Sequence, residues 1–471
     1  MSILAIDAGT TGVTTLLLTR EGGVLASATC DFAQHFPQPG WVEHDPEDIW
    51  KAVLTATKKV LDGSALRPSA IGITNQRETL VLWDKTTLQA PRRAIVWQDR
   101  RTVDLDADPA RVKELTGLPL DPYFTSSKLL WVKRNEPQIF AGLEAGRTAA
   151  GTIDSYLIAK MSGGRHHITD ASNASRTQLY DLAKGDWSDE LLDLFEFPRQ
   201  SLPTIVPSYG KLADTMPEAF LGLALPITGI AGDQQAALFG QCAFEPGEAK
   251  CTFGTGAFLL KNTGPEIAQT KDLLATVAFQ TPSGERLFAL EGSTFVAGAA
   301  VQWLRDGIGL IDNYDQIELE AADSSEGVIV VPALTGLGAP FWKPEATGTI
   351  TGLTRGSTRA HILRATLEGI AMQVALVAEQ MGELKALRVD GGASANNLLI
   401  QILADLTGVE VLRPTHVEAT AIGAGYLAGL GSGLWSSQSE LTELNPIRQR
   451  FTPGTKDLEL IERWRAAASA I

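Results

Sequence analysis

A phrase of strand, glycine-rich turn and strand occurs twice in this chain, and it constrains the fold more than any other feature. Apolar and β-branched runs punctuated by glycine occupy Ile3–Ile6, Thr14–Thr19 and Val24–Ala28, a composition typical of consecutive strands. The same order returns in Glu248–Phe253, Ala257–Lys261, Leu274–Phe279 and Arg286–Leu290. Because 471 residues are too many for one ordinary core, the repeat predicts two domains built on one plan. We place them at 1–242 and 243–471.

Segments with helical periodicity alternate with these strands. Asp45-Pro46-Glu47-Asp48 is typical of a helix start, with Asp as N-cap and Pro in the first turn. Further helices are expected at Thr294–Arg305, His361–Met381 and Ala419–Leu430, and strands at Ala70–Thr74, Gly327–Val331 and Ala386–Val389. This alternation predicts an α/β fold with mixed, partly parallel sheets flanked by helices.

Charge and cysteine content exclude several classes of function. Forty Lys and Arg against 55 Asp and Glu give a formal charge of −15, which disfavours a broad nucleic-acid or anionic-membrane surface. Cys30, Cys242 and Cys251 show no metal or redox spacing, and we expect the last two to be buried. Met1-Ser2 leads into a predicted strand, not a signal peptide. We therefore expect a cytoplasmic protein that neither binds nucleic acid nor inserts into a membrane.

Two distant carboxylates each follow an apolar run and stand beside small residues, Asp7 in Asp7–Gly12 and Asp233 in Gly232–Gln235. This suggests two half-sites across a cleft, one for a magnesium nucleotide and one for the group that receives phosphate. The P-loop and dinucleotide fingerprints are missing from the sequence. Glycine turns at Asp7–Gly12 and Gly254–Gly256 could instead hold phosphate through backbone N–H and Thr hydroxyl groups. Plain hairpin turns are the alternative interpretation, and the corresponding positions of the two turns favour function.

Each carboxylate has a structural and a chemical interpretation. Asp233 precedes a predicted helix, where Asp is a good N-cap. A carboxylate at that place stays anionic and could take the proton of a substrate hydroxyl as it attacks a γ-phosphate. Asp7 is either a turn former or a support for Mg²⁺, usually through water.

Other residues also allow two interpretations. Arg77-Glu78 follows a predicted strand. Adjacent opposite charges are commonly a solvated surface pair, whereas in a cleft they suit the neighbouring hydroxyls of a small polyol. Asp390-Gly391-Gly392 is either a tight turn or a backbone surface on which a nucleotide base or ribose could lie. Trp97 and Tyr123, taken singly, are typical of core or turn residues.

A set of motifs running almost end to end is similar to those of the FGGY carbohydrate kinases, in the actin/hexokinase/Hsp70 superfamily. The motifs are Gly40–Pro46, Asn75–Thr79, Trp97–Arg101, Asp121–Phe124, Gly229–Gln241, Gly336–Pro340 and Val389–Asn397. Tyr123–Trp131 also fits the family signature, with Lys128 and Trp131 at the expected offsets. Within the family, the set most resembles the members that act on glycerol.

The resemblance implies two ribonuclease-H-like (actin-like ATPase) domains around a deep cleft. It also implies transfer of phosphate from ATP, with Mg²⁺, to a terminal hydroxyl of glycerol, giving sn-glycerol 3-phosphate. By position, Asp233 would be the general base, and Asp7 and Asp233 would support the metal. The residues implied to bind glycerol are Arg77, Glu78, Tyr123, Asp233 and Gln234, with Trp97 and Phe258 on its carbon edge. Those implied for the phosphates are Thr10, Thr11, Gly12, Thr255 and Gly256, and for adenosine Gly298, Gln302, Gly392 and Asn396. A homodimer or homotetramer is implied as well.

The chain departs from the family pattern in three places, one of which is the segment Asp104–Thr116, shorter here than is usual. Thr14 stands where related kinases carry an arginine near the nucleotide phosphates. Lys211–Pro226 lacks both the Gly-Gly-Thr-Arg loop that binds fructose 1,6-bisphosphate in some bacterial members and the phosphorylated histidine of others. Two alternatives therefore stay open, a kinase for another short polyol or ketose and a catalytically silent nucleotide sensor. Retention of both aspartates and of the polyol set favours the kinase.

Overall fold

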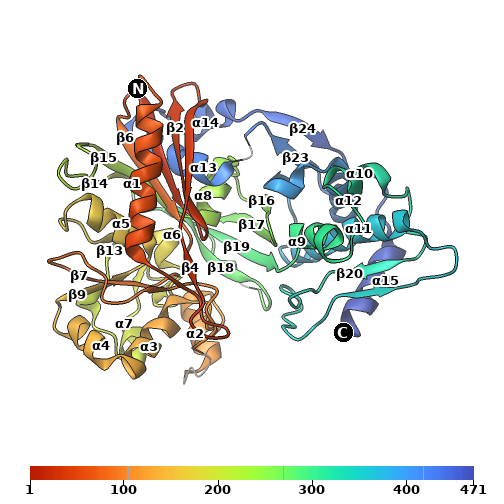
Figure 1. Ribbon diagram of the computed structural model, residues 1–471, viewed down its shortest axis with the longest axis horizontal. Coiled ribbons are helices and arrows are strands. Elements are labelled where there is room, and N and C mark those ends of the chain that lie inside the picture. Colours follow the sequence, from red (N-terminus) through yellow and green to blue (C-terminus); the bar gives the residue numbers. More distant parts are fainter. Residues whose placement is uncertain (103–106, 269, 417) are drawn as a thin grey trace.

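Two large mixed sheets dominate the computed structural model (Figure 1), which describes residues 1–102, 107–268, 270–416 and 418–471. The strands of the first sheet are, in order, β14 (Tyr209–Asp214), β15 (Pro226–Gly232), β6 (Ala70–Asn75), β1 (Ser2–Ala8), β2 (Gly12–Thr19) and β3 (Val24–Asp31). Those of the second are β18 (Leu274–Gln280), β19 (Arg286–Thr294), β17 (Ala257–Gly264), β16 (Glu248–Phe253), β22 (Ala386–Asp390), β23 (Val411–Pro414) and β24 (Ile447–Phe451).

The two sheets repeat one pattern of pairing. β1 is antiparallel to β2 and parallel to β6, which is in turn parallel to β15. β16 is likewise antiparallel to β17 and parallel to β22, which is parallel to β23. The second sheet differs by one additional edge strand, β18. The predicted α/β class with mixed sheets is confirmed, and the repeated phrase of the sequence is the first hairpin of each unit.

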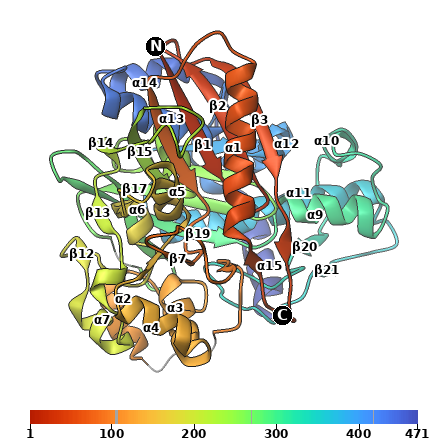
Figure 2. The same cartoon turned by 60° about the vertical axis from the view of Figure 1, so that its left-hand side comes forward.

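Helices cover both faces of the first sheet (Figure 2). α1 (Pro46–Asp62) begins after its N-cap Asp45, as predicted, and packs on the face that carries Leu4 and Ile6. The opposite face, with Ile3 and Ala5, packs against α8 (Asp233–Gly240) and α13 (Ala419–Ser432). Side chains alternate along a strand, so Asp7 projects to the same side as Ile3 and Ala5, toward the layer formed by α8 and α13.

Of the remaining helices, some pack against the first sheet, some surround the second sheet and some form an outer lobe of the first half. α2, α3, α4 and α7 lie together at one end of the molecule (Figure 2). Helix bounds are α2 Pro109–Thr116, α3 Thr125–Asn135, α4 Pro137–Glu144, α5 Ile153–Met161, α6 Ala171–Ala174, α7 Asp189–Phe195, α10 Asp315–Glu320, α11 Arg359–Gln380, α12 Asn397–Thr407, α14 Gln438–Leu444 and α15 Leu458–Ser469. Small sheets pair β4 (Gln34–His35), β5 (Glu43–His44) and β8 (Ala94–Ile95), β7 (Val81–Asp84) with β9 (Thr148–Gly151), β10 (Ile168–Asp170) with β13 (Thr204–Val206), β11 (Tyr180–Asp181) with β12 (Asp186–Trp187), and β20 (Ile329–Val331) with β21 (Thr349–Thr351).

One helix begins later than predicted. The sequence predicts a helix from Thr294, but Thr294 pairs with Ala257 as the last residue of β19. Helical structure starts at α9 (Gly298–Gln302) and continues as a π-helical turn to Gly307. The β-branched Thr294 fits the pleated ladder better than a helix, and the ladder decides the boundary.

Among the described residues, α11 alone is long and apolar enough to span a membrane by length and composition. Within the fold, 78% of its most apolar window is buried. Its side chains, including Leu367, Met372 and Val374, belong to a large hydrophobic core cluster that also contains residues of the first half. α11 therefore acts here as a core helix.

The helices α8 and α13 cross at glycines. They follow β15 and β23, which have corresponding places in the two sheets. A Cβ built on Gly240 would lie 2.1 Å from the Ala419 carbonyl oxygen, and one on Gly423 would lie 1.8 Å from the Ala236 oxygen. The two backbones are thus in contact, and this brings the second half of the chain onto the face of the first sheet.

We predict that Gly423→Ala destabilises the protein, because the added methyl meets backbone that has no alternative place. The cost of such overpacking is of order 1–3 kcal/mol. It would be measured as a lower thermal midpoint. Gly356→Ala is the control, since its Cβ would meet only the Thr354 hydroxyl at 3.7 Å. Equal midpoints for the two variants would contradict a glycine-dependent crossing.

Candidate functional site

The carboxyl ends of three parallel strands meet at one edge of the first sheet. Asp7 lies near the end of β1, Arg77 and Glu78 follow β6, and Asp233 follows β15. The register pairs Asp7 with Thr74, and Gly232 with Asn75. In sheets of this kind, ligands bind outside the carboxyl ends of the strands. The sheet therefore brings together charged residues that are far apart in the sequence.

Asp233 is not the N-cap that the structural interpretation expected. Gly232 takes that position, and Asp233 is the first residue of α8, with no side-chain cap at this helix start. Its Oδ1 accepts a hydrogen bond from its neighbour Gln234 N at 2.7 Å and forms an ion pair with Arg77 Nε at 3.0 Å. The Asp233 side chain is 28% exposed, whereas Arg77 behind it is 2% exposed. The Asp233 carboxylate is thus partly open to solvent, while the arginine that pairs with it is buried.

Arg77 and Glu78 are not the solvated surface pair of the alternative interpretation, because both are buried. Arg77 also binds Glu291, and Glu78 binds Arg176. Glu78 has a positive φ of 62°, a strained conformation for a non-glycine residue. Sequence reasoning missed both partners. A carboxylate inside the apolar strand 286–294 was the one signal for Glu291, and no pattern singled out Arg176.

An aromatic pair joins the polyol residues to the first glycine turn. The rings of Trp97 and Tyr123 meet edge to face, with centroids 5.5 Å apart. Trp97 Nε1 donates to the Thr10 hydroxyl at 3.0 Å. Burial, followed by the charge of Glu78, raises the pKa of Tyr123, so its hydroxyl stays protonated and can donate. The predicted residues Trp97, Tyr123 and Thr10 are thus brought together.

A buried lysine, which the sequence indicated only as part of a family signature, supports this tyrosine. Lys128 donates to the carbonyl oxygens of Pro122, Tyr123 and Phe124, at 2.9, 2.6 and 3.1 Å. Three bonds from one ammonium fix the turn that carries the Tyr123 ring. Lys128 therefore holds backbone and does not face the cleft.

The second sheet contributes Phe258 and a second buried lysine. Phe258 pairs with Thr252 in the β16/β17 ladder and so shares a face with it. Lys250, two residues from Thr252 on the same strand, donates to the Thr252 hydroxyl at 3.0 Å and to Gln234 Oε1. Burial lowers the pKa of Lys250, while Asp390 and Asp233 oppose that shift. Gln234, from the first half, is thereby tied to the face that carries Phe258.

The residues predicted for phosphate lie in corresponding hairpin turns of the two units. Thr10 and Thr11 connect β1 to β2, and Thr255 connects β16 to β17. In the first turn Gly9 N donates to Gly12 O at 3.0 Å, and in the second Gly254 N donates to Gly256 O at 2.9 Å. Thr11 and Thr255 are exposed. Both turns are thus hairpin turns, and each carries an exposed threonine that a ligand could contact.

Three of the four residues predicted for adenosine lie where helical segments of the second half begin. Gly298 N donates to Gly254 O at 3.0 Å, which places the start of α9 against the second glycine turn. A Cβ on Gly392, after β22, would meet no atom within 4 Å. Asn396 caps α12 by accepting from Leu399 N at 2.8 Å. Gln302 is exposed at the end of α9.

Asp7 has the features of a carboxylate that awaits a cation. Its Oδ1 is shielded and has no hydrogen-bond partner. Burial, then the charges of Asp233 and Glu418, raise the pKa of Asp7 to about 8. A divalent cation beside it would supply the missing positive charge. The Mg²⁺ implied by the resemblance thus fits Asp7, with Asp233 as its neighbour.

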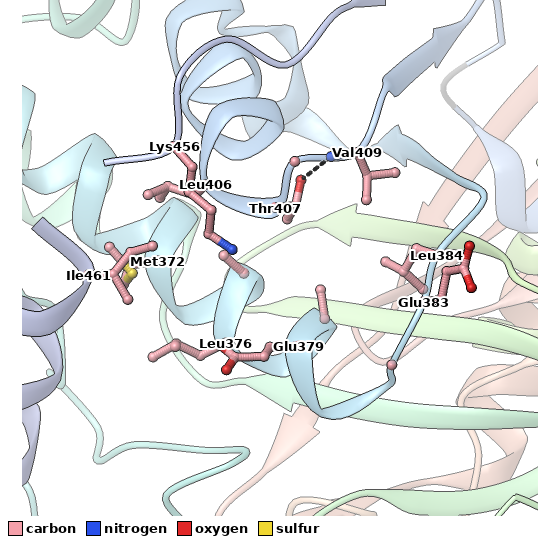
Figure 3. A pocket seen from close by; sticks show the side chains of 14 residues that line it. Met372, Leu376, Glu379, Glu383, Leu384, Leu406, Thr407, Val409, Lys456 and Ile461 are labelled. Atoms are coloured by element: carbon pink, nitrogen blue, oxygen red, sulfur yellow. Dashed lines mark hydrogen bonds between the residues drawn. The ribbon is translucent and has the colours of Figure 1, made fainter. Parts of the chain in front are cut away.

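Two cavities of about 470 Å³ differ in what they contain. The first opens between α11, α12 and α15, where Met372, Leu376, Leu406 and Ile461 line it (Figure 3). None of the predicted site residues, all of which are described, lines that cavity. The second is bounded by Tyr123, Glu291, Phe295, Leu337 and Trp342. Its contact with Tyr123 identifies the second cavity as part of the candidate active site.

Comparison with known proteins agrees with this geometry. Models of the FGGY family of carbohydrate kinases match residues 2–240 (N-terminal domain) and 249–432 (C-terminal domain). A glycerol kinase of Bdellovibrio bacteriovorus is 47% identical over 100% of this chain and 99% of that protein. One of Dechloromonas aromatica is 49% identical over 96% and 93%. A crystal structure of Plasmodium falciparum glycerol kinase with ADP has a TM-score of 0.93 at 32% identity, covering 100% and 98%.

We predict that stability falls as the pH drops from 6.5 to about 4, in part through His44. Burial, then the charge of His35, lowers the pKa of His44 from 6.5 to about 4, so in this window the folded state binds fewer protons than the unfolded state. The His44 ring accepts from Gln76 Nε2 at 3.2 Å, and the same nitrogen donates to Gly9 O of the first glycine turn.

Thermal midpoints from pH 7 to 4 test this. In His44→Gln, the loss of unfolding free energy on acidification should be smaller by up to about 3 kcal/mol. In His166→Gln, at a partly exposed position, that loss should stay as in the unaltered protein. The same slope in His44→Gln as in the unaltered protein would contradict the prediction.

Proposed function

We propose the function of this chain from one premise: it belongs to the FGGY family of carbohydrate kinases. It is an ATP-dependent glycerol kinase that phosphorylates glycerol to sn-glycerol 3-phosphate in glycerol catabolism. The observation that carries this is the single guanidinium of Arg77, which joins the polyol residues to Asp233. The full-length similarity to glycerol kinases supports the same substrate.

In the proposed mechanism, Arg77, Glu78, Tyr123 and Gln234 bind the hydroxyl groups of glycerol, while Trp97 and Phe258 pack on its carbons. Asp233, held at the start of α8 by Arg77, accepts the proton of the attacking hydroxyl. Buried groups that need a hydroxyl partner reject analogues lacking it. The recognition side of the cleft thus orients the substrate and places its terminal oxygen at the base.

The phosphate side uses backbone and hydroxyl donors in this proposal. Thr10, Thr11 and Gly12 face Thr255 and Gly256 around the phosphates of ATP, and Gly298, Gln302, Gly392 and Asn396 line the adenosine site. Asp7 and Asp233 would hold Mg²⁺ through water molecules. Bound Mg²⁺ would neutralise charge on the transferring phosphoryl group. Thr14, whose hydroxyl pairs with Thr29 at 3.0 Å, adds no positive charge there.

Further parts of the proposal concern the protein as a whole. We divide the chain into domains 1–242 and 243–471, because each contains one copy of the repeated sheet. We place the enzyme in the cytoplasm, where ATP is available and its buried Cys242 and Cys251 stay reduced. We propose a homodimer or homotetramer, which light scattering would test, and no nucleic-acid partner.

A coupled ADP-release assay tests the substrate. We expect the highest kcat/KM with glycerol among glycerol, dihydroxyacetone, glyceraldehyde, erythritol, xylulose and ribulose, because the buried charged residues enclose a small polyol. A higher kcat/KM with a ketose than with glycerol would favour the alternative of a kinase for a short ketose. Binding of ATP and glycerol by calorimetry without ADP release would favour the sensor.

Asp233→Asn tests the base. The amide preserves shape but cannot accept the proton, so kcat should fall by about 10²–10⁴-fold with glycerol affinity nearly kept. The circular dichroism spectrum should be unchanged. Asp189→Asn, at an exposed position on α7, serves as control. Turnover within about threefold of the unaltered enzyme would remove Asp233 from this role.

A further inference from the structure

Four charged side chains form a buried cluster beneath the proposed glycerol site. Arg77, Glu78, Arg176 and Glu291 are each between 0% and 3% exposed. Two of them, Arg77 and Glu78, belong to the polyol set. Arg176 and Glu291 have no role in the mechanism above, and the burial of their charges requires an explanation, because desolvating a charge is costly unless it is paired.

The contacts of the cluster are directional. Glu291 accepts from both terminal nitrogens of Arg77, with Oε2 to Nη1 at 2.6 Å and Oε1 to Nη2 at 2.9 Å. Arg176 Nε donates to Glu78 Oε1 at 2.6 Å, and Arg176 Nη2 donates to Glu291 Oε1 at 3.3 Å. Arg77 Nε remains for Asp233, at 3.0 Å. The terminal fork of Arg77 is therefore fixed by Glu291, and its orientation sets the Nε–Asp233 contact.

The cluster also connects the two halves of the chain. Arg77 and Glu78 follow β6 and Arg176 follows α6, whereas Glu291 lies on β19 of the second sheet. Leu274, opposite Glu291 in the β18/β19 ladder, lines the same cavity as Tyr123 and Glu291. The orientation of the recognition arginine on one sheet thus depends on a carboxylate supplied by the other.

The pKa shifts of the two glutamates, Glu291 and Glu78, distinguish their roles in the cluster. Burial by itself would raise the pKa of Glu291, but Arg176 and Arg77 outweigh burial and hold it at about 2. For Glu78, burial is the larger influence and raises its pKa despite the same two arginines. Glu291 is therefore the permanent counter-charge of Arg77, and Arg176 shares its positive charge between the two glutamates.

We infer that Glu291 and Arg176 are positioning residues for glycerol: they fix the geometry of Arg77 and Glu78 and so set discrimination between glycerol and polyols that lack a hydroxyl. This rests on the proposed function and adds to it the residues that tune the substrate side. Planar, bidentate pairing makes such fixation effective, because a guanidinium fork matches a carboxylate in only a few orientations.

The first test is Glu291→Gln, which keeps the shape but removes the charge. We expect KM for glycerol to rise at least about tenfold, since Arg77 loses its counter-charge and turns toward Asp233. KM for ATP should change less than about twofold. The ratio of kcat/KM for glycerol to that for propane-1,2-diol should fall at least about fivefold, because loosened recognition groups penalise a missing hydroxyl less. A general loss of structure would not selectively change that ratio.

Glu368→Gln is the matched control. Glu368 is also a buried glutamate of the second half, paired with Arg364 at 2.7 Å on α11, outside the proposed site. It should leave both KM values and the discrimination ratio unchanged. If Glu291→Gln does not fold, Arg176→Lys carries the same test, because it keeps the charge but loses the fork that joins Glu78 to Glu291.

A double variant sharpens the result. Glu291→Gln combined with Arg176→Gln removes one negative and one positive charge, so Arg77 and Glu78 remain as a neutral pair. We expect KM for glycerol to recover at least about threefold relative to Glu291→Gln alone. Independent structural damage would instead multiply the two losses.

Three outcomes would overturn the inference: an unchanged discrimination ratio in Glu291→Gln, a parallel rise of both KM values, or multiplicative losses in the double variant. Failure of the proposed function is distinguishable, because the unaltered enzyme would then not prefer glycerol in the first place.

Discussion

The bidentate pair between Arg77 and Glu291 is the contact on which the rest of the site depends. A guanidinium is rigid and planar, so fixing Nη1 and Nη2 on Glu291 also fixes Nε against Asp233. A lysine at position 77 could satisfy one of these partners but not hold both in one plane. The proposed base and the proposed polyol site are thus oriented by one side chain.

This arrangement requires that the two sheets approach closely. Glu291 belongs to the second sheet and reaches Arg77 only because the halves of the chain pack together along α8 and α13. The glycine crossing at Gly240 and Gly423 allows backbone-to-backbone contact there. A repeated fold with small residues at its internal interface is therefore what allows a charge from one repeat to be buried inside the other.

Local patterns in the sequence predicted most of the strands and helices. They failed where residues far apart in the sequence determine the environment of a side chain. The strands of both hairpins, the start of α1 after Asp45 and the burial of Cys242 and Cys251 follow from residue type and spacing, and all are confirmed. Arg77-Glu78, judged by residue type alone, looked more like a surface pair, because Arg176 and Glu291 lie far along the chain. Gly232, not Asp233, caps α8, since Asp233 is held by Arg77. The roles assigned to site residues in the proposed mechanism remain predictions.

The charges on the two sides of the cleft suit the two states of a phosphorylation. Beneath the polyol side, two arginines and two glutamates sum to zero, so a neutral polyol meets no uncompensated charge. On the phosphate side, the charge of Asp233 is one of the influences that raise the pKa of Asp7. Negative charge on Asp233 opposes a phosphate that lacks its cation. On the proposed function, glycerol enters a balanced pocket, whereas the phosphorylated product becomes repelled once the metal departs. Asp233 would then assist both the reaction and the release of its product.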